Sequence, residues 1–459
     1  MKVLFLYSYE YLEPLGIMSL SAVLKQNGHE CEFIDLAFEK DYARKAAAMK
    51  PGIIAYSVTT GRHGFYRRLN LELKKSMDFF SVFGGPHATF FPEFVEEDGV
   101  DAICRGEGEY AMLELAESLQ SGRECAGIQN LWVKSGGDIH RNEPRPLVGD
   151  LDSLPFVDRA LVNKYKHYRN LHRRSVMTGR GCPYRCSYCF NHSYNDLYKG
   201  KGAVIRRRSV RHVLDELKSV SRECGPRRFH FLDDTFILDE KWCLDFCRRY
   251  PGEVGKPFIA YTRVNLVTDN IVKNLRDAGC VTILYAIESG NDYIRNKVLD
   301  RNITRSEILS AVKSYKKYNV RTYAQNMLAL PGETIDMAFE TVNLNIECRP
   351  DYAWCSIFQP YPRTKLGEYC RENGLLAGDD FDESYYRRSI LKSEDRPEME
   401  NLHHLFSVAV AFPALLSPVR FLIRLPLEAL YFCVWHLHRA WCYFFRVNWI
   451  DFSEVFVRE

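Results

Sequence analysis

The chain has 459 residues, a formal net charge of +3 at pH 7 and 15 cysteines. This length exceeds what one hydrophobic core usually serves, so about two or three domains are expected. The nearly balanced charge gives no basis for nucleic-acid binding. The opening residues hold too short an apolar run for a secretion signal, so the cysteines indicate reduced thiols in a cytoplasmic protein.

Residues 1–130 alternate apolar strands with helical patterns, which predicts one α/β domain. Strands are expected at 2–8, 32–36, 53–58, 79–83 and 102–104, and helices at 16–27, 65–77 and 110–119. Strands joined by helical crossovers form a parallel, doubly wound, Rossmann-like sheet. Such a sheet binds its ligand at the carboxyl ends of its strands.

Small and polar residues gather at the ends of four of these strands. Glycine at such a position lets the backbone approach a bulky ligand closely, although a lone glycine pair would indicate only a tight turn. The shared character of four strand ends therefore predicts a ligand site. Its candidate residues are Tyr7, Ser8, Ser57, Thr59, Thr60, Gly84, Gly85, Pro86, His87, Gly106, Glu107 and Gly108.

Two stretches carry little functional signal in the sequence. Residues 131–173 have weak periodicity, three prolines and mixed charge, which predicts a linker between domains. The basic run from Arg206 to Arg208 is interpreted as a solvated surface, because that is the usual place of a charge run.

The segment TGRGCPYRCSYCFN, residues 178–191, places Cys182, Cys186 and Cys189 in a C-x3-C-x2-C pattern. Three thiolates this close together predict one shared soft metal centre. A structural zinc site needs a fourth protein ligand, and the only nearby candidate, His192, lies too close to Cys189. A four-iron cluster held by three cysteines keeps one iron open for a substrate. The spacing therefore favours a reactive [4Fe–4S] cluster over structural zinc.

This cysteine pattern, with the aromatic Tyr188 just before the last cysteine, resembles the radical S-adenosylmethionine (SAM) superfamily. The resemblance implies that the open iron chelates the amino and carboxylate groups of SAM. It also implies that one electron, from a donor such as flavodoxin or ferredoxin, splits SAM to give a 5′-deoxyadenosyl radical. The protein itself supplies binding, orientation and exclusion of side reactions.

Residues 174–373 repeat a strand–helix rhythm. Six strands are expected at 175–178, 228–232, 257–261, 281–287, 320–328 and 353–358, and the helices at 210–224, 240–250, 269–278, 305–318, 333–346 and 365–372. Six βα units predict a partial (β/α)6 barrel with its chemistry at the carboxyl ends of the strands. The radical SAM family implies the same partial barrel.

Polar groups follow these strands in order and are interpreted as SAM contacts. A carboxylate after the second strand would accept hydrogen bonds from the SAM ammonium, and an arginine after the third would pair with the SAM carboxylate. The family resemblance places ribose contacts after the fourth strand and adenine contacts in the LPGET turn. Each residue alone could be a turn or a helix cap. Together with Tyr188, the candidates are Asp233, Asp234, Arg263, Glu288, Ser289, Pro331 and Gly332.

The stretches GGPHAT (84–89) and RGEGE (105–109), with the run PLGIMSLSAVLKQNGHECEFIDL (14–36), resemble the cobalamin-binding domain of cobalamin-dependent radical SAM enzymes. Cobalamin mutases ligate cobalt through the histidine of a D-x-H-x-x-G motif, and this motif does not occur in the chain. The resemblance therefore implies cobalamin bound without a protein histidine ligand, with His87 as a loop or neighbouring contact. A domain that has lost its cofactor is the alternative.

Residues 374–459 are expected to form a C-terminal helical region, in which 402–450 is rich in Phe, Leu and Trp. Arginines and prolines recur too often here for a membrane-spanning helix, which needs about 20 mainly apolar residues. Two interpretations stay open. The helices cap the barrel and close the substrate cavity, or they form an amphipathic segment in peripheral contact with the inner face of the membrane.

The sequence thus predicts a cobalamin-dependent radical SAM enzyme that methylates an unactivated carbon of a small or lipid-like substrate between its two domains. Radical cyclisation, rearrangement or carbon–carbon coupling without methyl transfer is the alternative. A non-catalytic metal-binding scaffold is an alternative of another class. Methylthiotransferases carry a second cysteine triad, and the positions of Cys31, Cys104 and Cys125 argue against one. No general acid or base can be named.

Overall fold

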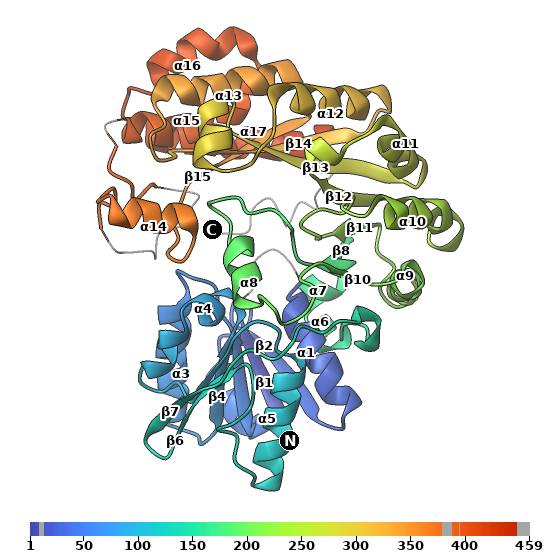
Figure 1. The fold of residues 1–459 in the computed structure, drawn as a ribbon, viewed down its shortest axis with the longest axis vertical. Coiled ribbons are helices and arrows are strands. Elements are labelled where there is room, and N and C mark those ends of the chain that lie inside the picture. The colour runs from blue at the N-terminus through green and yellow to red at the C-terminus, as the bar shows by residue number, and fades with distance from the viewer. Residues whose placement is uncertain (9–12, 379–387, 394, 448–459) are drawn as a thin grey trace. The chain divides into compact units, whose positions relative to one another are not determined.

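The computed structural model describes residues 1–8, 13–378, 388–393 and 395–447 (Figure 1). The chain divides into two compact units. Unit 1 comprises Met1–Leu171 and Ser193–Arg208, and unit 2 comprises His172–His192 and the chain from Ser209 onward. The segment that follows the cysteine loop therefore returns to unit 1, whereas the sequence predicted one continuous barrel domain over 174–373.

Unit 1 is built on a sheet in the order β2-β1-β3-β4-β5-β6-β7, in which the pairs from β2 to β5 are parallel. Successive side chains of β1 enter opposite hydrophobic clusters, Phe5 on one face and Leu4 and Leu6 on the other. Helices cover both faces, with α3 and α4 on the left of Figure 1 and α1 and α5 on the right. The predicted doubly wound fold is confirmed. The bounds are β1 (Lys2–Tyr7), β2 (Glu30–Asp35), β3 (Ile53–Ser57), β4 (Phe80–Gly84), β5 (Ala102–Cys104), α1 (Leu15–Gln26), α2 (Tyr42–Met49), α3 (His63–Lys74), α4 (Gly85–Phe90) and α5 (Glu109–Ser121).

Residues 131–141, expected to belong to a linker, instead extend this sheet. They form β6 (Leu131–Ser135) and β7 (Asp138–Arg141), which are antiparallel to β5 and to each other. Gly136 and Gly137 both have positive φ and make the tight turn between the two strands. The buried side chains of β6 are those of Leu131 and Val133. An apolar alternation this short does not reveal a strand in the sequence.

Unit 2 contains a six-stranded sheet in the order β15-β14-β13-β12-β11-β8, and every neighbouring pair is parallel. The strands therefore follow one another across the sheet in chain order, each joined to the next by helices, which confirms the predicted partial barrel. The bounds are β8 (Arg173–Val176), β11 (Arg228–Phe231), β12 (Phe258–Thr262), β13 (Cys280–Glu288), β14 (Arg321–Leu328), β15 (Tyr352–Ile357), α9 (Val210–Cys224), α10 (Glu240–Glu253), α11 (Asp269–Asp277), α12 (Arg305–Lys317), α13 (Ile335–Cys348) and α14 (Lys365–Glu372).

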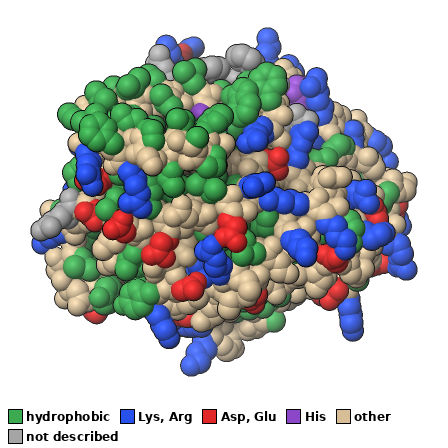
Figure 2. Space-filling view, turned by 90° about the horizontal axis from the view of Figure 1, so that it is seen from above, with side chains coloured by type: hydrophobic (Ala, Val, Ile, Leu, Met, Phe, Trp, Pro, Cys, Tyr) green, Lys and Arg blue, Asp and Glu red, His purple; other side chains and the backbone are tan. Residues whose placement is uncertain are grey.

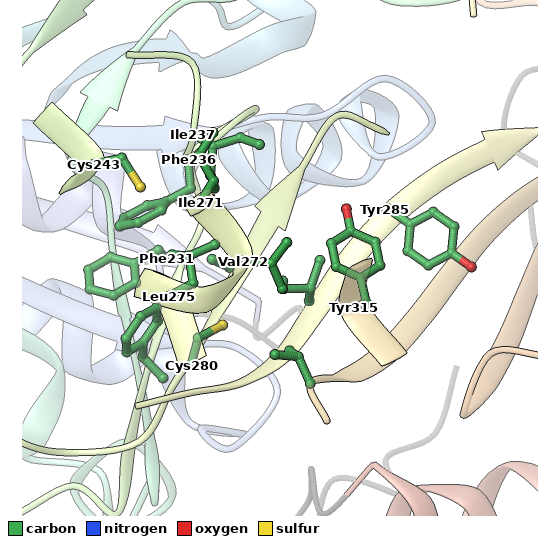
Figure 3. Packing of buried hydrophobic residues seen from close by; sticks show 14 of the residues in the cluster. Phe231, Phe236, Ile237, Cys243, Ile271, Val272, Leu275, Cys280, Tyr285 and Tyr315 are labelled. Carbon is green, nitrogen blue, oxygen red and sulfur yellow. The ribbon is translucent and has the colours of Figure 1, made fainter. Parts of the chain in front are cut away.

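One side of this sheet packs against the helices in a large hydrophobic cluster. In Figure 3 the rings of Phe231 and Phe236 lie in the same cluster as Ile271 and Leu275 of α11. All four side chains are buried. Each such side chain contributes about 1.5–3 kcal/mol by leaving water. This packing holds the strands, and hence the polar groups at their carboxyl ends, in fixed positions.

The other side of the sheet is partly covered by the C-terminal segment. Leu284, Tyr323 and Tyr352, on neighbouring strands, form a separate cluster with Cys442 and Val447. The hydroxyl groups of Tyr323 and Tyr443 also lie 3.3 Å apart. These contacts support the interpretation that the C-terminal region caps the barrel.

The described residues from Arg396 to Arg446 are mainly helical, as predicted for the C-terminal region. They form α15 (Arg396–Ala411), α16 (Leu416–Leu422), α17 (Glu428–Trp441) and the π-helical turn η6 (Cys442–Arg446). Helix α15 packs against β15 and α13 in one cluster that includes Leu402 and Phe406. Among the helices that the structure describes, we find none with the length and apolar character needed to span a bilayer.

A glycine at the end of β13 permits close contact with α13. A Cβ atom on Gly290 would lie 2.3 Å from the carbonyl oxygen of Glu340 and 2.6 Å from the Cα of Thr341. Because these are backbone atoms, Gly290→Ala must displace the helix, and we expect the free energy of unfolding to fall by about 1–3 kcal/mol. Urea unfolding measures this loss. Gly252→Ala in α10, where a Cβ would meet nothing within 4 Å, is the control and should not destabilise the protein; equal losses would contradict the prediction.

Candidate functional site

The three cysteines lie on a loop that follows β9 (Gly179–Arg180). Neighbouring segments hold Ser187, in the middle of this loop. Its N–H donates to the carbonyl of Leu299 (3.1 Å) and its hydroxyl to the carbonyl of Val298 (2.6 Å). Its own carbonyl accepts from the N–H of Leu366 (2.9 Å). The loop is therefore fixed by the protein itself.

His192, the fourth ligand that a zinc site would need, is engaged elsewhere. It is buried, and its Nε2 accepts a hydrogen bond from the N–H of Lys365 at the start of α14 (3.1 Å). A ring nitrogen that accepts from a backbone donor has its lone pair occupied and cannot bind a metal at the same time. This contact argues against a zinc site completed by His192.

The cysteine side chains have the chemistry that a cluster needs, although they are not gathered into a ready-made metal site. Burial, with smaller contributions from Asp234, Cys186 and Cys182, raises the pKa of Cys189 to about 12, against the effect of a backbone hydrogen bond at Asn191. The pKa of Cys182 is raised by burial first and then by Asp234 and Cys186. Three thiols on one loop are the donors that a [4Fe–4S] cluster takes, and bound iron deprotonates such thiols. The residues therefore fit the cluster.

A largely buried network lies directly beside this loop. The hydroxyl of Tyr188 donates to Glu288 Oε1 (2.9 Å). Arg301 Nη1 donates to the Tyr188 hydroxyl (2.5 Å) and to Glu288 Oε1 (3.3 Å), and its Nη2 donates to the carbonyl of Ala286 (2.9 Å). Burial raises the pKa of Glu288, while the charge of Arg301 and the hydrogen bond from Tyr188 act in the opposite direction. The network fixes a carboxylate at the carboxyl end of β13, next to the cysteine loop.

Arg263, predicted to pair with the SAM carboxylate, lies at the end of β12 in the same neighbourhood. Its guanidinium carbon lies 3.7 Å from the centre of the Tyr184 ring, and its Nη1 is 3.9 Å from Cys186 Sγ. Nη2 also donates to the carbonyl of Arg301. The side chain therefore places a positive charge against a predicted cluster ligand, and its contact with SAM remains a prediction.

The other predicted SAM residues divide into turn-forming and exposed groups. The Asp233 carboxylate accepts from the N–H (3.1 Å) and the hydroxyl (2.6 Å) of Thr178, so it fixes the strand that leads into the cysteine loop. Asp234 is exposed and near the thiols. The Ser289 hydroxyl accepts from the N–H of Asn291 (3.2 Å) and is buried in its turn. Of the two aspartates, Asp234 is the better placed for a ligand.

The LPGET turn follows β14. Gly332 has a φ of +74°, and a Cβ there would meet nothing within 4 Å, so the turn requires glycine for its backbone conformation and is open on that side. Glu333 turns back, and its Oε2 accepts from the N–H of Leu330 (3.1 Å). Burial raises the pKa of Glu333 to about 8. The turn that carries the predicted adenine contacts Pro331 and Gly332 is thus held by a buried carboxyl group.

Glu333 should make stability depend on pH. Because its pKa is about 8 in the folded chain and 4.5 in a solvated reference, the native state keeps a proton that the unfolded chain loses between these values. The contribution of Glu333 to the free energy of unfolding is therefore fully present below pH 4.5 and is lost as the pH rises through 8. We expect the free energy of unfolding of Glu333→Gln, measured in urea without SAM, to exceed that of the wild type by up to roughly 4 kcal/mol at pH 9. At pH 5 the two values should differ little.

The exposed Glu372→Gln variant is the matched control for loss of one negative charge. It should differ from the wild type by the same small amount at both pH values. If Glu333→Gln showed no more pH dependence than this control, the buried carboxyl group would not be the cause.

In unit 1 the carboxyl ends of β1, β3, β4 and β5 lie along one edge of the sheet, because these strands are parallel. Ser8, Ser57, Thr59 and Thr60, four of the predicted residues, are half-buried there. Half-buried hydroxyl groups at one edge can donate to and accept from the amide groups that surround a corrin ring. The residues present therefore fit a cobalamin site.

The glycines of this edge are required by contacts within unit 1. A Cβ on Gly85, whose φ is +89°, would lie 2.8 Å from the backbone nitrogen of Val58. A Cβ on Gly106, whose φ is +75°, would lie 1.8 Å from the hydroxyl oxygen of Tyr198. That hydroxyl accepts from the N–H of Glu107 (3.1 Å). The loops after β4 and β5 can thus close only with glycine at these two positions.

His87 is enclosed by other side chains. Its ring stacks between His63 (4.0 Å between centroids) and Phe91 (4.8 Å), and its Nδ1 lies 3.3 Å from the Thr60 hydroxyl. Burial, with a smaller contribution from His63, lowers the pKa of His87 to about 3, so the ring is neutral. This packing agrees with the prediction that His87 is a neighbouring contact and not a cobalt ligand.

The prediction that the basic run is solvated is wrong for Arg206, which is buried. Its Nη1 donates to Glu107 Oε2 (2.9 Å) and to the carbonyl of Val148 (2.9 Å), and Glu107 Oε2 also accepts from the N–H of Val148 (3.0 Å). A charge run does not show which of its members is buried. The pair directs the Glu107 carboxylate toward Arg206, while the backbone N–H and carbonyl of Glu107 are bonded to Tyr198 and Asn130. A contact of Glu107 with cobalamin therefore stays a prediction.

In comparisons with known proteins, each unit matches a family model. A family model described as the B12 binding domain matches residues 1–116, and one described as the Radical SAM superfamily matches residues 176–344. The chain is 32% identical over 373 residues to an uncharacterized methyltransferase of Pyrococcus horikoshii, covering 79% of each protein. It is 27% identical over 380 residues to the anaerobic magnesium-protoporphyrin IX monomethyl ester cyclase of Cereibacter sphaeroides, covering 78% of this chain and 60% of the cyclase.

A solved structure shares the fold. The radical S-adenosylmethionine methyltransferase TsrM of Kitasatospora setae, with cobalamin and a [4Fe–4S] cluster bound, matches with a TM-score of 0.68 and 20% identity, covering 81% of this chain and 75% of that one. With tryptophan substrate and a SAM analog bound, the same enzyme matches with a TM-score of 0.69, covering 86% and 80%. At 20% identity, this similarity shows that the two chains share a fold and nothing more.

Proposed function

The chain belongs to the family of radical SAM proteins that carry an N-terminal B12-binding domain, and we propose that it is a cobalamin-dependent C-methyltransferase. The observation that carries this proposal is the cysteine loop of the partial barrel, which neighbouring segments hold through Ser187 and which the Tyr188–Glu288–Arg301 network borders. A structural zinc site needs neither this network nor a first domain of the B12-binding family.

When bound, the cluster supplies the electron that cleaves SAM to a 5′-deoxyadenosyl radical, and the cobalamin supplies the methyl group. Cys182, Cys186 and Cys189 would hold the cluster. The Glu288 carboxylate, oriented by Tyr188 and Arg301, would accept hydrogen bonds from the ribose hydroxyls of SAM. The exposed Asp234 and the cationic Arg263 supply charges opposite to those of the SAM ammonium and carboxylate.

In unit 1 we assign the cobalamin contacts to the half-buried hydroxyls at the ends of β1 and β3, with the glycine turns after β4 and β5 beside them. The packing of the His87 ring between His63 and Phe91 supports cobalamin binding without a protein histidine on cobalt. His87 would then not bind the cobalt. The hydroxyl groups of the protein would bind the amide side chains of the corrin ring.

We further propose a small or lipid-like substrate, because the family includes relatives whose names specify small molecules. The relatives at 22% and 21% identity are a cytidylyl-2-hydroxyethylphosphonate methyltransferase of Streptomyces wedmorensis and a tryptophan 2-C-methyltransferase of Streptomyces laurentii. We propose a cytoplasmic enzyme, peripheral on the inner face of the membrane, that receives electrons from a flavodoxin or ferredoxin.

The test is anaerobic purification and reconstitution with iron, sulfide and hydroxocobalamin. We expect absorption bands of both a [4Fe–4S] cluster and a corrinoid, and formation of 5′-deoxyadenosine when SAM and dithionite are added. A candidate substrate should gain the mass of one methylene group. Zinc in place of iron, with no SAM cleavage, would instead support the metal-binding scaffold and end the proposal.

A second candidate is radical cyclisation without methyl transfer. It is favoured by the 27% identity to the protoporphyrin ester cyclase over 380 residues. Product mass distinguishes the two reactions, because cyclisation leaves the carbon count of the substrate unchanged and methylation raises it by one.

A further inference from the structure

The C-terminal helices expose large apolar side chains. Figure 2 shows hydrophobic side chains gathered on one side of the face seen from above, with Lys and Arg around them. Leu437 is 73% exposed, Phe445 is 72% exposed and Phe421 is 64% exposed. We use the name C-terminal apolar face for Phe412, Phe421, Leu430, Leu437, Trp441 and Phe445.

These side chains follow the geometry of α17. Leu430, Leu437 and Trp441 recur at intervals of seven and four residues, which places them on one side of a helix, and Phe445 follows four residues later in η6. The opposite side of α17 is buried through Trp435. The helix therefore has one apolar side packed against its own unit and a second that faces solvent.

The face is continuous from α15 to η6. The ring of Phe412, at the end of α15, lies 6.0 Å from the ring of His438, which itself lies 6.0 Å from the ring of Trp441. Soluble monomers rarely expose contiguous apolar patches beyond a few hundred Å², and larger ones mark binding surfaces. The exposed side chains of this face make it a candidate binding surface.

The charge of the segment indicates which kind of partner binds the C-terminal apolar face. Residues 413–447 contain four arginines (420, 424, 439 and 446) and one acidic residue, Glu428, so the segment is positive. The guanidinium groups of Arg439 and Arg446 lie over the rings of Trp435 (4.6 Å) and Trp441 (5.5 Å). Arg420 and Arg424 pair with Asp336 and Glu398 at the surface. A second copy would bring the same positive charge, whereas an anionic headgroup layer attracts it.

We propose that the C-terminal apolar face docks on an anionic lipid surface, with its Leu, Phe and Trp side chains at the boundary of headgroups and acyl chains and the exposed Arg446 against lipid phosphates. Aromatic and leucine side chains beside arginines are the composition of segments that lie in a membrane interface without spanning it. This inference rests on the proposed peripheral membrane location and adds the surface and the class of lipid that it binds. It does not depend on the proposed chemistry, because binding is measured without turnover.

The test is co-sedimentation of the full-length holoenzyme with phosphatidylcholine vesicles that contain phosphatidylglycerol. We expect binding to these vesicles, weak binding to phosphatidylcholine alone and release at high salt. Leu437→Glu and Phe445→Glu should each abolish binding, since each would bury a carboxylate in the interface. Arg446→Gln should weaken binding about fivefold.

Tyr369→Glu on α14 is the matched control, because Tyr369 is 51% exposed and lies outside the face. It should bind as the wild type does, and all variants should keep the wild-type thermal transition. Wild-type protein that does not sediment, or that binds both vesicle types equally at high salt, overturns the proposal. So does a stable dimer that Leu437→Glu dissociates, which would make the face an interface between two copies.

Discussion

Replacing Cys182, Cys186 and Cys189 together by alanine will abolish SAM cleavage. After anaerobic reconstitution and reduction with dithionite, the variant will form no 5′-deoxyadenosine above the background without enzyme. The loop then holds no thiolate, and the described residues hold no other group of metal-binding side chains. The three sulfur donors are the ligands that a cluster requires, so their loss removes the group that donates the electron to SAM as well as the site that binds SAM.

The matched control is Cys125→Ala, because Cys125 is also partly exposed but lies outside the loop. This variant should take up iron and cleave SAM as the wild type does. A ligand that binds only the native state raises the melting temperature, so reconstitution should stabilise the wild type and the control but not the triple variant. Cluster absorption in the triple variant would show that other residues carry the iron.

The sequence predicted the two parallel sheets well because their signals are local. Buried strands such as β1 and β13 are short, mainly apolar runs, and helices such as α9 and α12 have a clear apolar period. β6 and β7 were missed because an edge hairpin buries few side chains. The return of 193–208 to unit 1 could not be predicted, because it is defined by long-range contacts such as that of Tyr198 with Glu107.

In the candidate site, too, features with a local sequence signal were predicted and those that depend on long-range contacts were not. The cysteine spacing, the acid at the end of β13 and the LPGET turn are visible in the sequence because each is a short motif. Arg301 was not predicted, although it joins Tyr188 and Glu288, because it lies in a loop thirteen residues after Glu288 with no pattern around it. The partner of Tyr184 was also missed, since stacking with Arg263 joins two strand ends. Burial of a single charged residue leaves no periodic signal.

Arg301 should nevertheless be one of the most sensitive positions in unit 2. Arg301→Met removes the cation that pairs with the Glu288 carboxylate, whose side chain is only 12% exposed, and leaves that charge uncompensated. Breaking a buried ion pair on one side costs about 3–5 kcal/mol, so the free energy of unfolding should fall by this amount. Tyr188 also loses a partner beside Cys189, and we expect SAM cleavage to fall about 10- to 100-fold.

A double-mutant cycle separates this ion pair from a packing defect. Glu288→Gln in the Arg301→Met background should recover part of the stability, because an amide in place of the carboxylate needs no cation and still accepts from Tyr188. Arg305→Met is the control, since its pair with Glu347 is half exposed and should cost at most about 1 kcal/mol. If urea unfolding gave the same loss for both arginines, or no recovery in the double variant, Arg301 would only fill space. A selective loss at Arg301 would instead identify it as the positioning residue that orients Glu288 and Tyr188 at the mouth of the half-barrel.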